Sequence, residues 1–392
     1  MADPVRGVTI LGSTGSIGRQ TLDVIRRLAG RFRVVGLAGG NNDTLLEDQA
    51  REFHPDVVWC QDGGRHMDLK AAAGRKAHWA TMEEMASHPD AEIVVVATSG
   101  AAGLDPTLAA LRAGKAVALA NKEVLVMAGH LVTRAAEAGR GELRPVDSEH
   151  SAIWQCLWGE DIAAVEKLVL TASGGAFRDR PLRELAGVTP RDALRHPTWD
   201  MGRKVTIDSA TLMNKGFEAI EARWLFNVPM ERIEVLMHRE SIVHSLVEFA
   251  DGSVKAQLGE PDMRLPIQCA LSYPERMATD AAPRLNLART QTLHFEEPDL
   301  GRYPALRLAL EAGAKGGTWT TVLAAADEVA VEAFVGGAIR FTDIARVVDN
   351  TLSAHAGEAD PSLEAVRAAD AWARECAEGQ IPGRATVPAR LR

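Results

Sequence analysis

The sequence predicts an α/β protein in three parts: a doubly wound α/β domain at the N-terminus, a central α+β domain and a C-terminal α-helical domain. Three observations predict this fold class. Short apolar runs alternate with helical stretches over the first part of the chain, which is typical of a parallel sheet with helices on both faces. Strand-like runs and an Asp-Gly turn follow in the middle of the chain. Beyond Tyr303, Ala, Leu and Glu recur at helical spacing.

The N-terminal domain is expected at residues 1–146. Its strands are continuous apolar runs, as in strands that are buried on both faces. Helical stretches separate these runs, and this alternation gives the βαβ units of a doubly wound parallel sheet. The expected strands are residues 8–11, 33–37, 56–59, 93–96 and 116–119, and the expected helices between them include 17–28 and 43–53.

The central domain is expected at residues 147–272. Asp251-Gly252 lies between two alternating runs and predicts a hairpin. A sheet edge in this region is a surface through which two copies can pair. Strands are expected at 165–171, 233–237, 241–249 and 253–258, a helical segment at 202–225, a linker at 273–299 and the C-terminal helical domain at 300–392.

Composition excludes several classes of protein. The 392 residues carry a formal net charge of −9 and no long basic run, so nucleic acid is not an expected partner. No apolar segment reaches the roughly 18 residues of a membrane span, and the N-terminus lacks the pattern of a signal peptide. We therefore expect a cytoplasmic protein that does not bind membranes. The four cysteines are far apart and are expected to be reduced: Cys60, Cys156, Cys269 and Cys376.

A glycine pattern follows the first expected strand and opens a helix, with Gly12, Gly15 and Gly18 at a spacing of three. Such glycines permit a tight turn, close approach of a pyrophosphate and close helix packing, as in Rossmann-like dinucleotide-binding domains. The helix N-terminus then presents free N–H groups to the phosphates. The pattern predicts a dinucleotide site, and the alternative is a tight turn with a structural role only.

The end of the second expected strand bears on the choice of dinucleotide. NAD-binding proteins usually carry an acidic residue here for the ribose hydroxyls. This chain has Gly40, Asn41 and Asn42 instead, which favours NADP. No Arg or Lys follows the strand to bind a 2′-phosphate, so Asn41 and Asn42 are the candidate hydrogen-bond donors. Arg65 is a further candidate that would have to reach the phosphate from elsewhere.

Asn121, Lys122 and Glu123 follow the fifth expected strand. Polar residues at the carboxyl end of such a strand lie where ligands bind in α/β sheets. The alternative is an ordinary helix start with Asn121 as its N-cap. The two interpretations are compatible.

Asp147 and Glu149 are candidate metal ligands. In an extended segment their side chains would point the same way. Two carboxylates with no cation nearby in the sequence suit a hard divalent ion, and Glu218 would add a third carboxylate. His150 lies beside them and is interpreted as a packed residue rather than a ligand.

The segment 201–218 combines two lysines, several hydroxyl groups, an amide and two carboxylates, which suit a binding site better than a core. A Lys with Ser, Thr and Asn donors suits a phosphate. If a helix begins near Ser209, Asn214 and Glu218 share one face, and a carboxylate one turn away suits a metal ion. The segment therefore indicates a small phosphorylated substrate next to a metal.

Two further motifs lie upstream of this segment. Ser173-Gly174-Gly175 follows a strand and can wrap an anion with backbone N–H groups, or it is a plain turn. Trp199 is flanked by His196-Pro197 and Asp200. Such a Trp fits a lid that closes over a cleft and excludes water, and the alternative is a surface loop with one packed Trp.

Taken together and in this order, the motifs resemble those of the 1-deoxy-D-xylulose 5-phosphate reductoisomerase family, from Gly12 to residues 340–344. The resemblance implies an NADP-dependent oxidoreductase of isoprenoid biosynthesis. Such an enzyme rearranges and reduces 1-deoxy-D-xylulose 5-phosphate to 2-C-methyl-D-erythritol 4-phosphate, with NADPH and Mg²⁺ or Mn²⁺. It also implies a homodimer in which the central domain is the catalytic and dimerisation domain.

The resemblance also implies roles for individual residues, in addition to those expected for residues 40–42. The metal would be bound by Asp147, Glu149 and Glu218, and the expected catalytic residues are Glu149, Lys215 and His196. Residues 196–201 would form a mobile lid. The cofactor would contact Thr14, Gly15, Ser16, Ile17, Gly40, Asn41, Asn42, Asn121, Lys122, Glu123 and Gly202. The substrate would contact Ser148, Glu149, Ser173, His196, Trp199, Ser209, Asn214, Lys215 and Glu218.

The chain departs from the family pattern at two places. Relatives often carry a basic residue where this chain has Asn41, which bears on its preference for NADP over NAD. The family's Asn-Ala-Ala-Asn-Glu reads Ala-Ala-Ala-Asp-Glu at residues 324–328, interpreted as a packing difference without effect on chemistry. The alternative functions are an NADP-dependent dehydrogenase of another phosphorylated small molecule and a non-catalytic NADP sensor. The three carboxylates argue against the dehydrogenase, because simple hydride transfer does not need a chelated diol. A sensor would have little need for metal ligands and a Trp lid.

Overall fold

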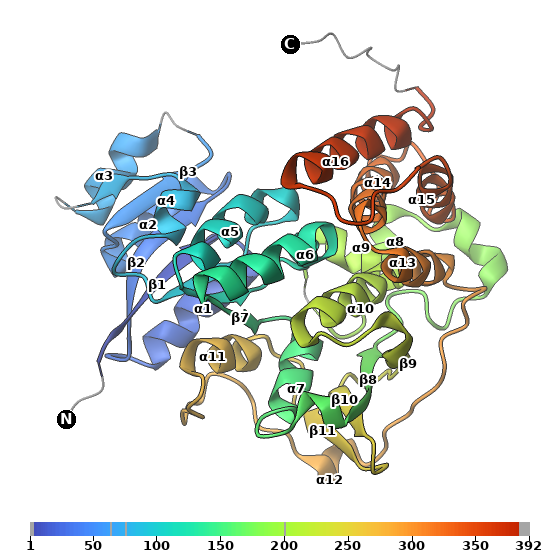
Figure 1. The fold of residues 1–392 in the computed structure, drawn as a ribbon, viewed down its shortest axis with the longest axis horizontal. Helices are drawn as coiled ribbons and strands as arrows, with labels where there is room; N and C mark the ends of the chain where they lie inside the picture. Colours follow the sequence, from blue (N-terminus) through green and yellow to red (C-terminus); the bar gives the residue numbers. More distant parts are fainter. Residues whose placement is uncertain (1–3, 63–64, 75–76, 200, 384–392) are drawn as a thin grey trace. The chain divides into compact units, whose positions relative to one another are not determined.

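The computed structural model of the chain describes residues 4–62, 65–74, 77–199 and 201–383 (Figure 1). The chain forms two compact units, and each unit is assembled from separate stretches of sequence. The predicted domain boundaries remain predictions. The first unit comprises residues 1–124, 130–158 and 258–285, and the second comprises 125–129, 159–257 and 286–392.

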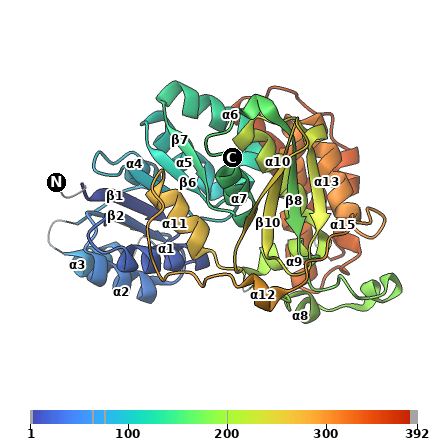
Figure 2. The same ribbon diagram turned by 90° about the horizontal axis from the view of Figure 1, so that it is seen from below.

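The first unit is built on a seven-stranded parallel sheet in the order β4-β3-β2-β1-β5-β6-β7. The order reverses direction between β1 and β5, and ligands bind at the carboxyl edge near such a point. Helices α1 and α2 lie on one side of the sheet and α4 and α5 on the other (Figure 2). The strands are Arg6–Leu11, Phe32–Gly39, Val57–Cys60, His78–Trp79, Ile93–Val96, Ala116–Leu119 and Glu142–Pro145.

All five predicted strands of this sheet are confirmed, and the fold class is the predicted doubly wound one. Strands β4 and β7 were not predicted, because β4 has two residues and β7 has the sequence Glu-Leu-Arg-Pro, which lacks an apolar run. The helices are α1 Ser16–Arg27, α2 Asp43–Phe53, α3 His66–Ala73, α4 Met82–Ala86, α5 Leu104–Arg112, α6 Lys122–Gly139, α7 Ser148–Cys156 and α11 Arg264–Ser272.

Helix α11 packs beside α1 and completes the core of the first unit (Figure 2). Its apolar face is buried with the side chains of β1 and β2. Arg144 of β7 donates a hydrogen bond to the carbonyl of Ala270, at 3.0 Å, and Arg6 of β1 donates to that of Leu271, at 3.1 Å. The carbonyls at the end of the helix thus find charged partners, which fixes α11 on the sheet.

The second unit contains a four-stranded sheet in the order β11-β10-β8-β9. β8 pairs antiparallel with β10 and parallel with β9. The predicted hairpin is confirmed: β10 and β11 are neighbours, and Gly252 at the turn has a φ of +83°, which favours glycine. The strands are β8 Val165–Ala172, β9 Ile233–Met237, β10 Val243–Phe249 and β11 Val254–Leu258.

The longer helices of the second unit lie to one side of this sheet (Figure 1). α10 packs on β8 and β9, and α13 packs on α10, so the C-terminal helices form the outer layer. The predicted helical region beyond Tyr303 is confirmed. The helices are α8 Pro190–Ala193, α9 Arg203–Thr211, α10 Met213–Phe226, α12 Leu287–Thr290, α13 Pro304–Lys315, α14 Thr318–Val335, α15 Asp343–Ser353 and α16 Leu363–Glu378.

The segment predicted as helical at 202–225 is divided by Leu212, which has a left-handed φ of +59°. The first helix begins at Arg203, close to the expected start of the helical segment at 202 rather than near Ser209, which lies in the last turn of α9. Asn214 and Glu218 both fall in α10 and still share a face. Among the described residues, no helix combines the length and the apolar character needed to cross a membrane.

Candidate active site

The predicted dinucleotide loop connects β1 to α1 and depends on two of its glycines. Gly12 has a φ of +92°, and a Cβ atom there would lie 2.4 Å from the carbonyl oxygen of Ala97. A Cβ atom at Gly18 would lie 2.3 Å from the carbonyl oxygen of Gly12. Gly15 is the N-cap of α1 and provides no side-chain cap. The first N–H groups of α1 are thus left for another acceptor, which fits a pyrophosphate.

The residues expected at the NADP ribose lie after β2. Gly40 and the exposed Asn41 follow the strand, and the Asn42 side chain accepts a hydrogen bond from the backbone N–H of Leu45 at the start of α2, at 3.2 Å. Arg65 forms an ion pair with Glu47 and approaches Asp68 at 3.3 Å. These carboxylates balance the charge of Arg65, so it is a poor candidate for the 2′-phosphate.

Asn121 is the N-cap of α6, as the alternative interpretation of an ordinary helix start predicted. Its side chain accepts from the backbone N–H of Val124 and donates to the carbonyl of Gly100, at 3.3 and 2.9 Å. Its amide also lies 3.3 Å from the hydroxyl of Thr98. The side chain therefore ties together the loops that follow β5 and β6, at the carboxyl edge of the sheet.

Lys122 and Asp147 form an ion pair at the same edge, with 2.6 Å between Nζ and Oδ2. They follow β6 and β7, which are neighbouring parallel strands. The expected extended conformation of residues 147–149 is wrong: Asp147 is the N-cap of α7 and Glu149 lies in its first turn. An acidic first turn is favoured by the helix dipole, which explains why the helix starts here.

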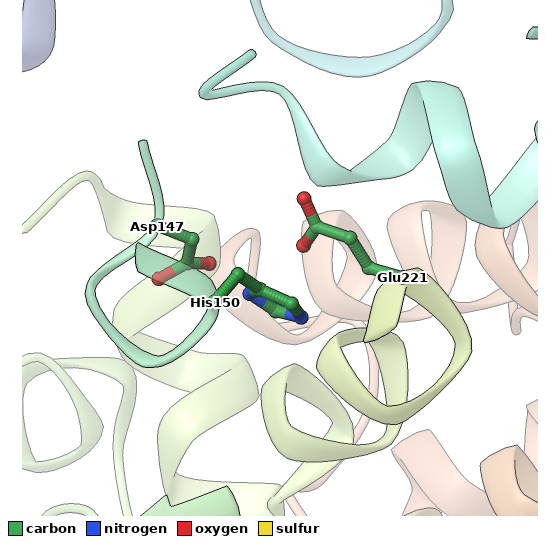
Figure 3. A group of neighbouring side chains, drawn as sticks. All are labelled: Asp147, His150 and Glu221. Atoms are coloured by element: carbon green, nitrogen blue, oxygen red, sulfur yellow. The ribbon is translucent and has the colours of Figure 1, made fainter. Parts of the chain in front are cut away.

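The start of α7 brings several predicted site residues together. Ser148 donates a hydrogen bond to the carboxylate of Glu149, at 2.7 Å. His150 is fully buried in the same turn, which agrees with its interpretation as a packed residue. Asp147 and His150 both come from the start of α7, whereas Glu221 comes from α10 of the second unit (Figure 3).

In α10, the carboxylate of Glu218 is held by two neighbours. Asn214 donates to one oxygen, at 2.5 Å, and Lys215 donates to the other. Lys215 and Glu218 are buried. Glu221, one turn further along, is also buried and was missed by the sequence analysis. The spacing Glu218-x-x-Glu221 was the available signal, because residues three apart lie on one helix face.

The side chains of Ser173, His196 and Ser209 meet in the second unit, although they are far apart in sequence. His196 Nε2 lies 3.0 Å from the hydroxyl oxygen of Ser173 and 3.1 Å from that of Ser209. His196 Nδ1 accepts from the backbone N–H groups of Thr198 and Trp199, at 3.1 and 2.8 Å. Because Nδ1 is an acceptor, the proton of the neutral ring is assigned to Nε2, which donates toward the hydroxyls.

His196 is neutral over the usual pH range. Burial, assisted by the positive charge of Arg178, lowers the pKa of its imidazole from 6.5 to about 4. The cluster of Ser173, His196 and Ser209 is therefore a set of uncharged hydrogen-bond donors. Such a set suits the oxygens of a phosphate whose charge is balanced by another group.

The loop after β8 packs directly on α9. Gly174 and Gly175 have φ angles of +86° and +66°, and a Cβ atom at Gly175 would lie 2.5 Å from the carbonyl oxygen of Ser209. Arg178 donates to the carbonyls of Ser173 and Arg239, at 2.9 and 3.0 Å. These contacts fix the loop, and the backbone N–H of Gly175 donates to the hydroxyl of Ser173, at 3.4 Å. The choice between an anion site and a plain turn remains a prediction.

The predicted lid begins at His196. The Trp199 ring lies 6.2 Å from that of His244 on β10. Asp200, which belongs to the predicted lid, lies outside the described residues. Gly202 is the N-cap of α9, and its carbonyl accepts a hydrogen bond from the Thr206 hydroxyl. Its predicted contact with the cofactor remains a prediction.

Comparisons with known proteins give the family of the chain. Residues 8–129 match the family model described as 1-deoxy-D-xylulose 5-phosphate reductoisomerase, residues 143–226 its C-terminal domain, and residues 258–376 the DXP reductoisomerase C-terminal domain. The chain is 54% identical to the 1-deoxy-D-xylulose 5-phosphate reductoisomerase of Pelotomaculum thermopropionicum over 376 residues, 94% of this chain and 97% of that protein. It is 52% identical to that of Shouchella clausii over 375 residues, 95% of this chain and 99% of that protein.

Solved structures agree with these matches. The reductoisomerase of Zymomonas mobilis in complex with NADPH is 44% identical, with a TM-score of 0.90, over 97% of this chain and 100% of that one. A DOX-P reductoisomerase in complex with NADPH, fosmidomycin and magnesium is 40% identical, with a TM-score of 0.89, over 96% of this chain and 98% of that one. The chain therefore belongs to the 1-deoxy-D-xylulose 5-phosphate reductoisomerase family.

Proposed function

We propose that the residues described above carry out the reaction of this family, the NADPH- and metal-dependent conversion of 1-deoxy-D-xylulose 5-phosphate to 2-C-methyl-D-erythritol 4-phosphate. The observation that carries the assignment is the carboxylate set of Asp147, Glu149 and Glu218, whose oxygens suit a hard divalent ion. A plain dehydrogenase of another phosphorylated molecule does not need such a set.

Asp147 also belongs to a second possible ligand set, with His150 and Glu221. Mg²⁺ prefers oxygen ligands, whereas a set that includes an imidazole suits transition metals better. The relatives in solved complexes were observed with magnesium. We therefore assign the metal to Asp147, Glu149 and Glu218, with Mg²⁺ or Mn²⁺ as the ion.

We propose that Ser173, His196, Ser209, Asn214 and Lys215 bind the substrate phosphate. His196 is neutral and donates Nε2–H, so the positive charge in this set is that of Lys215, whose ammonium also donates to Glu218. The phosphate is remote from the reacting carbons. Its binding energy can therefore hold the substrate in the reactive geometry.

When bound, the metal polarises the substrate carbonyl and the adjacent hydroxyl, and NADPH supplies a hydride. The chain's own residues then position the substrate and move protons. We assign the proton transfer to Glu149, whose carboxylate is oriented by the Ser148 hydroxyl and lies at the start of α7. Trp199 and the rest of the lid would exclude water from the intermediate.

The cofactor is assigned to the loop at Thr14, Gly15, Ser16 and Ile17, to residues 40–42, and to Lys122 and Glu123. The glycine contacts and the uncapped start of α1 support this assignment. Asn41 lies exposed after β2 and is the candidate donor for the 2′-phosphate. Asn121 supports the site by fixing the loops around it, and Gly202 is a proposed contact in the second unit.

We also propose a homodimer in the cytoplasm. β11 is an edge strand whose first residues are exposed, with Val254 at 53%. An exposed edge strand of this kind is a suitable surface for pairing with a second copy. The four cysteines are free, and three of them are buried, which fits a reducing compartment.

The proposal is tested by following NADPH absorbance with 1-deoxy-D-xylulose 5-phosphate, with and without Mg²⁺, and by identifying the product. Oxidation of NADPH that requires the metal and yields the branched 2-C-methyl-D-erythritol 4-phosphate supports it. Turnover of another sugar phosphate without rearrangement would favour the dehydrogenase alternative. If no sugar phosphate is turned over, the result would favour the alternative of a non-catalytic NADP sensor.

A further inference from the structure

Lys204, which is partly exposed, contacts side chains of three helices, and two of them are buried carboxylates. Its ammonium lies 2.5 Å from Asp208 on α9 and 2.8 Å from Asp327 on α14. It also lies 4.5 Å from the centre of the Phe217 ring on α10. The side chains of Asp208 and Asp327 are 2% and 0% exposed. Two buried carboxylates thus share one ammonium.

The position of Lys204 in its helix indicates that its two carboxylate partners compensate an unfavourable placement of its charge. It is the second residue of α9, where a cation opposes the helix dipole. A lysine is therefore unfavourable here unless its partners compensate. Asp208, one turn along, and Asp327 supply that compensation.

α9 is a short helix with few buried apolar side chains. It has nine residues, its N-cap provides no side-chain hydrogen bond, and it ends at the left-handed Leu212. A helix this short is marginal in isolation, so its place depends on tertiary contacts. Only Ile207 and Ala210 bury apolar side chains within it. Polar anchors must therefore provide much of its attachment to α14.

The anchored residue Asp208 is adjacent to Ser209, whose hydroxyl lies 3.1 Å from His196 Nε2. Phe217, whose ring contacts the Lys204 ammonium, is adjacent to Glu218 on α10. We propose that Lys204 is a positioning residue that, through Asp208 and Asp327, holds Ser209 in place for the substrate phosphate. This inference rests on the proposed role of Ser209 in phosphate binding.

The test compares two substitutions at Asp327 in the full-length enzyme. Asp327→Leu keeps a similar branched shape but removes the acceptor, and we expect the KM for 1-deoxy-D-xylulose 5-phosphate to rise about tenfold, the effect of one interaction of ordinary strength. The KM should rise more than kcat falls, because the phosphate is remote from the reacting carbons. The conservative Asp327→Asn keeps an oxygen acceptor and should restore the KM. Glu328→Gln, at the next residue of α14, is the matched control.

Ser209→Ala and the double variant with Asp327→Leu complete the test. If Lys204 acts through Ser209, the double variant should raise the KM less than the product of the two single effects. Multiplicative effects, or equal losses in Asp327→Leu and Asp327→Asn, would overturn the inference. An unchanged KM in Ser209→Ala would instead refute the phosphate role of Ser209. If Asp327→Leu does not fold, Lys204→Gln serves in its place, with the same expected rise in KM.

Discussion

The ammonium of Lys122 lies 2.6 Å from the carboxylate of Asp147, with side chains that are 9% and 15% exposed. The two residues follow the neighbouring strands β6 and β7, so the sheet itself brings them together. Lys122 belongs to the predicted cofactor site and Asp147 to the predicted metal site. The pair therefore links one residue of the predicted cofactor site to one residue of the predicted metal site. A carboxylate so little exposed needs a positive partner, and Lys122 provides one.

Replacing Lys122 by Met should tighten the binding of Mn²⁺ by about tenfold in the absence of NADPH, the effect of removing one competing interaction. The ammonium and the metal ion compete for the same carboxylate, and the variant removes the competitor. Titration followed by the electron paramagnetic resonance of Mn²⁺ measures this directly. Lys115→Met, at the amino end of β6, is a matched control and should leave the affinity unchanged. Weaker binding in Lys122→Met would mean that the lysine supports the metal site.

Glu218→Gln should lower kcat by about a hundredfold or more and weaken Mn²⁺ binding, because it removes a charged ligand but keeps its size. Glu221→Gln, one turn along the same helix, should leave the metal affinity nearly unchanged. The two variants are compared by turnover at saturating Mg²⁺ and by Mn²⁺ titration. The reverse pattern, with Glu221→Gln losing the metal, would assign the ion to Asp147, His150 and Glu221.

The low pKa of His196 predicts how stability depends on pH. The pKa is lowered to about 4 in the folded chain by burial and by Arg178, from an ordinary value of 6.5. The unfolded chain then binds the proton more readily. The contribution of His196 to stability is therefore fully present above pH 6.5 and is lost as the pH falls toward about 4.

His196→Gln should accordingly lose less stability than the parent between these two pH values, as measured by thermal unfolding. In the parent, the ring should remain neutral at neutral pH with its proton on Nε2, which nitrogen-15 shifts of the ring report. A ring that titrates near 6.5, or a proton on Nδ1, would contradict the assigned hydrogen bonds.

Strong local patterns made much of the fold predictable. The buried strands are continuous apolar runs, and the Asp-Gly hairpin has a single favoured geometry, so both follow from local chemistry. β7 was missed because its residues, Glu142–Pro145, owe their strand conformation to pairing with β6 rather than to their own pattern. The break at Leu212 was also missed, since a leucine carries no signal for a left-handed conformation.

The site could be predicted in residue type but not in contacts. Asp147 and Glu149 were identified as carboxylates, although the segment was expected to be extended. The sequence Asp-Ser-Glu at 147–149 resembles a helix start, and that signal was available. The pairing of Lys122 with Asp147 had no local signal, because it arises from strand order. The convergence of Ser173, His196 and Ser209 likewise depends on how loops pack on α9.

Gly18→Ala should raise the KM for NADPH by about tenfold and destabilise the chain by roughly 1–3 kcal/mol. The added Cβ atom would lie 2.3 Å from the carbonyl oxygen of Gly12 and 2.5 Å from the Cα atom of Ser13. Both are backbone atoms, so the turn that approaches the pyrophosphate must move. The affinity for Mn²⁺ should stay the same, because the metal ligands lie on other elements. Gly187→Ala is the control, since nothing lies within 4 Å of a Cβ atom there. NADPH fluorescence titration and thermal unfolding measure both effects, and an unchanged NADPH affinity in Gly18→Ala would place the cofactor away from this loop.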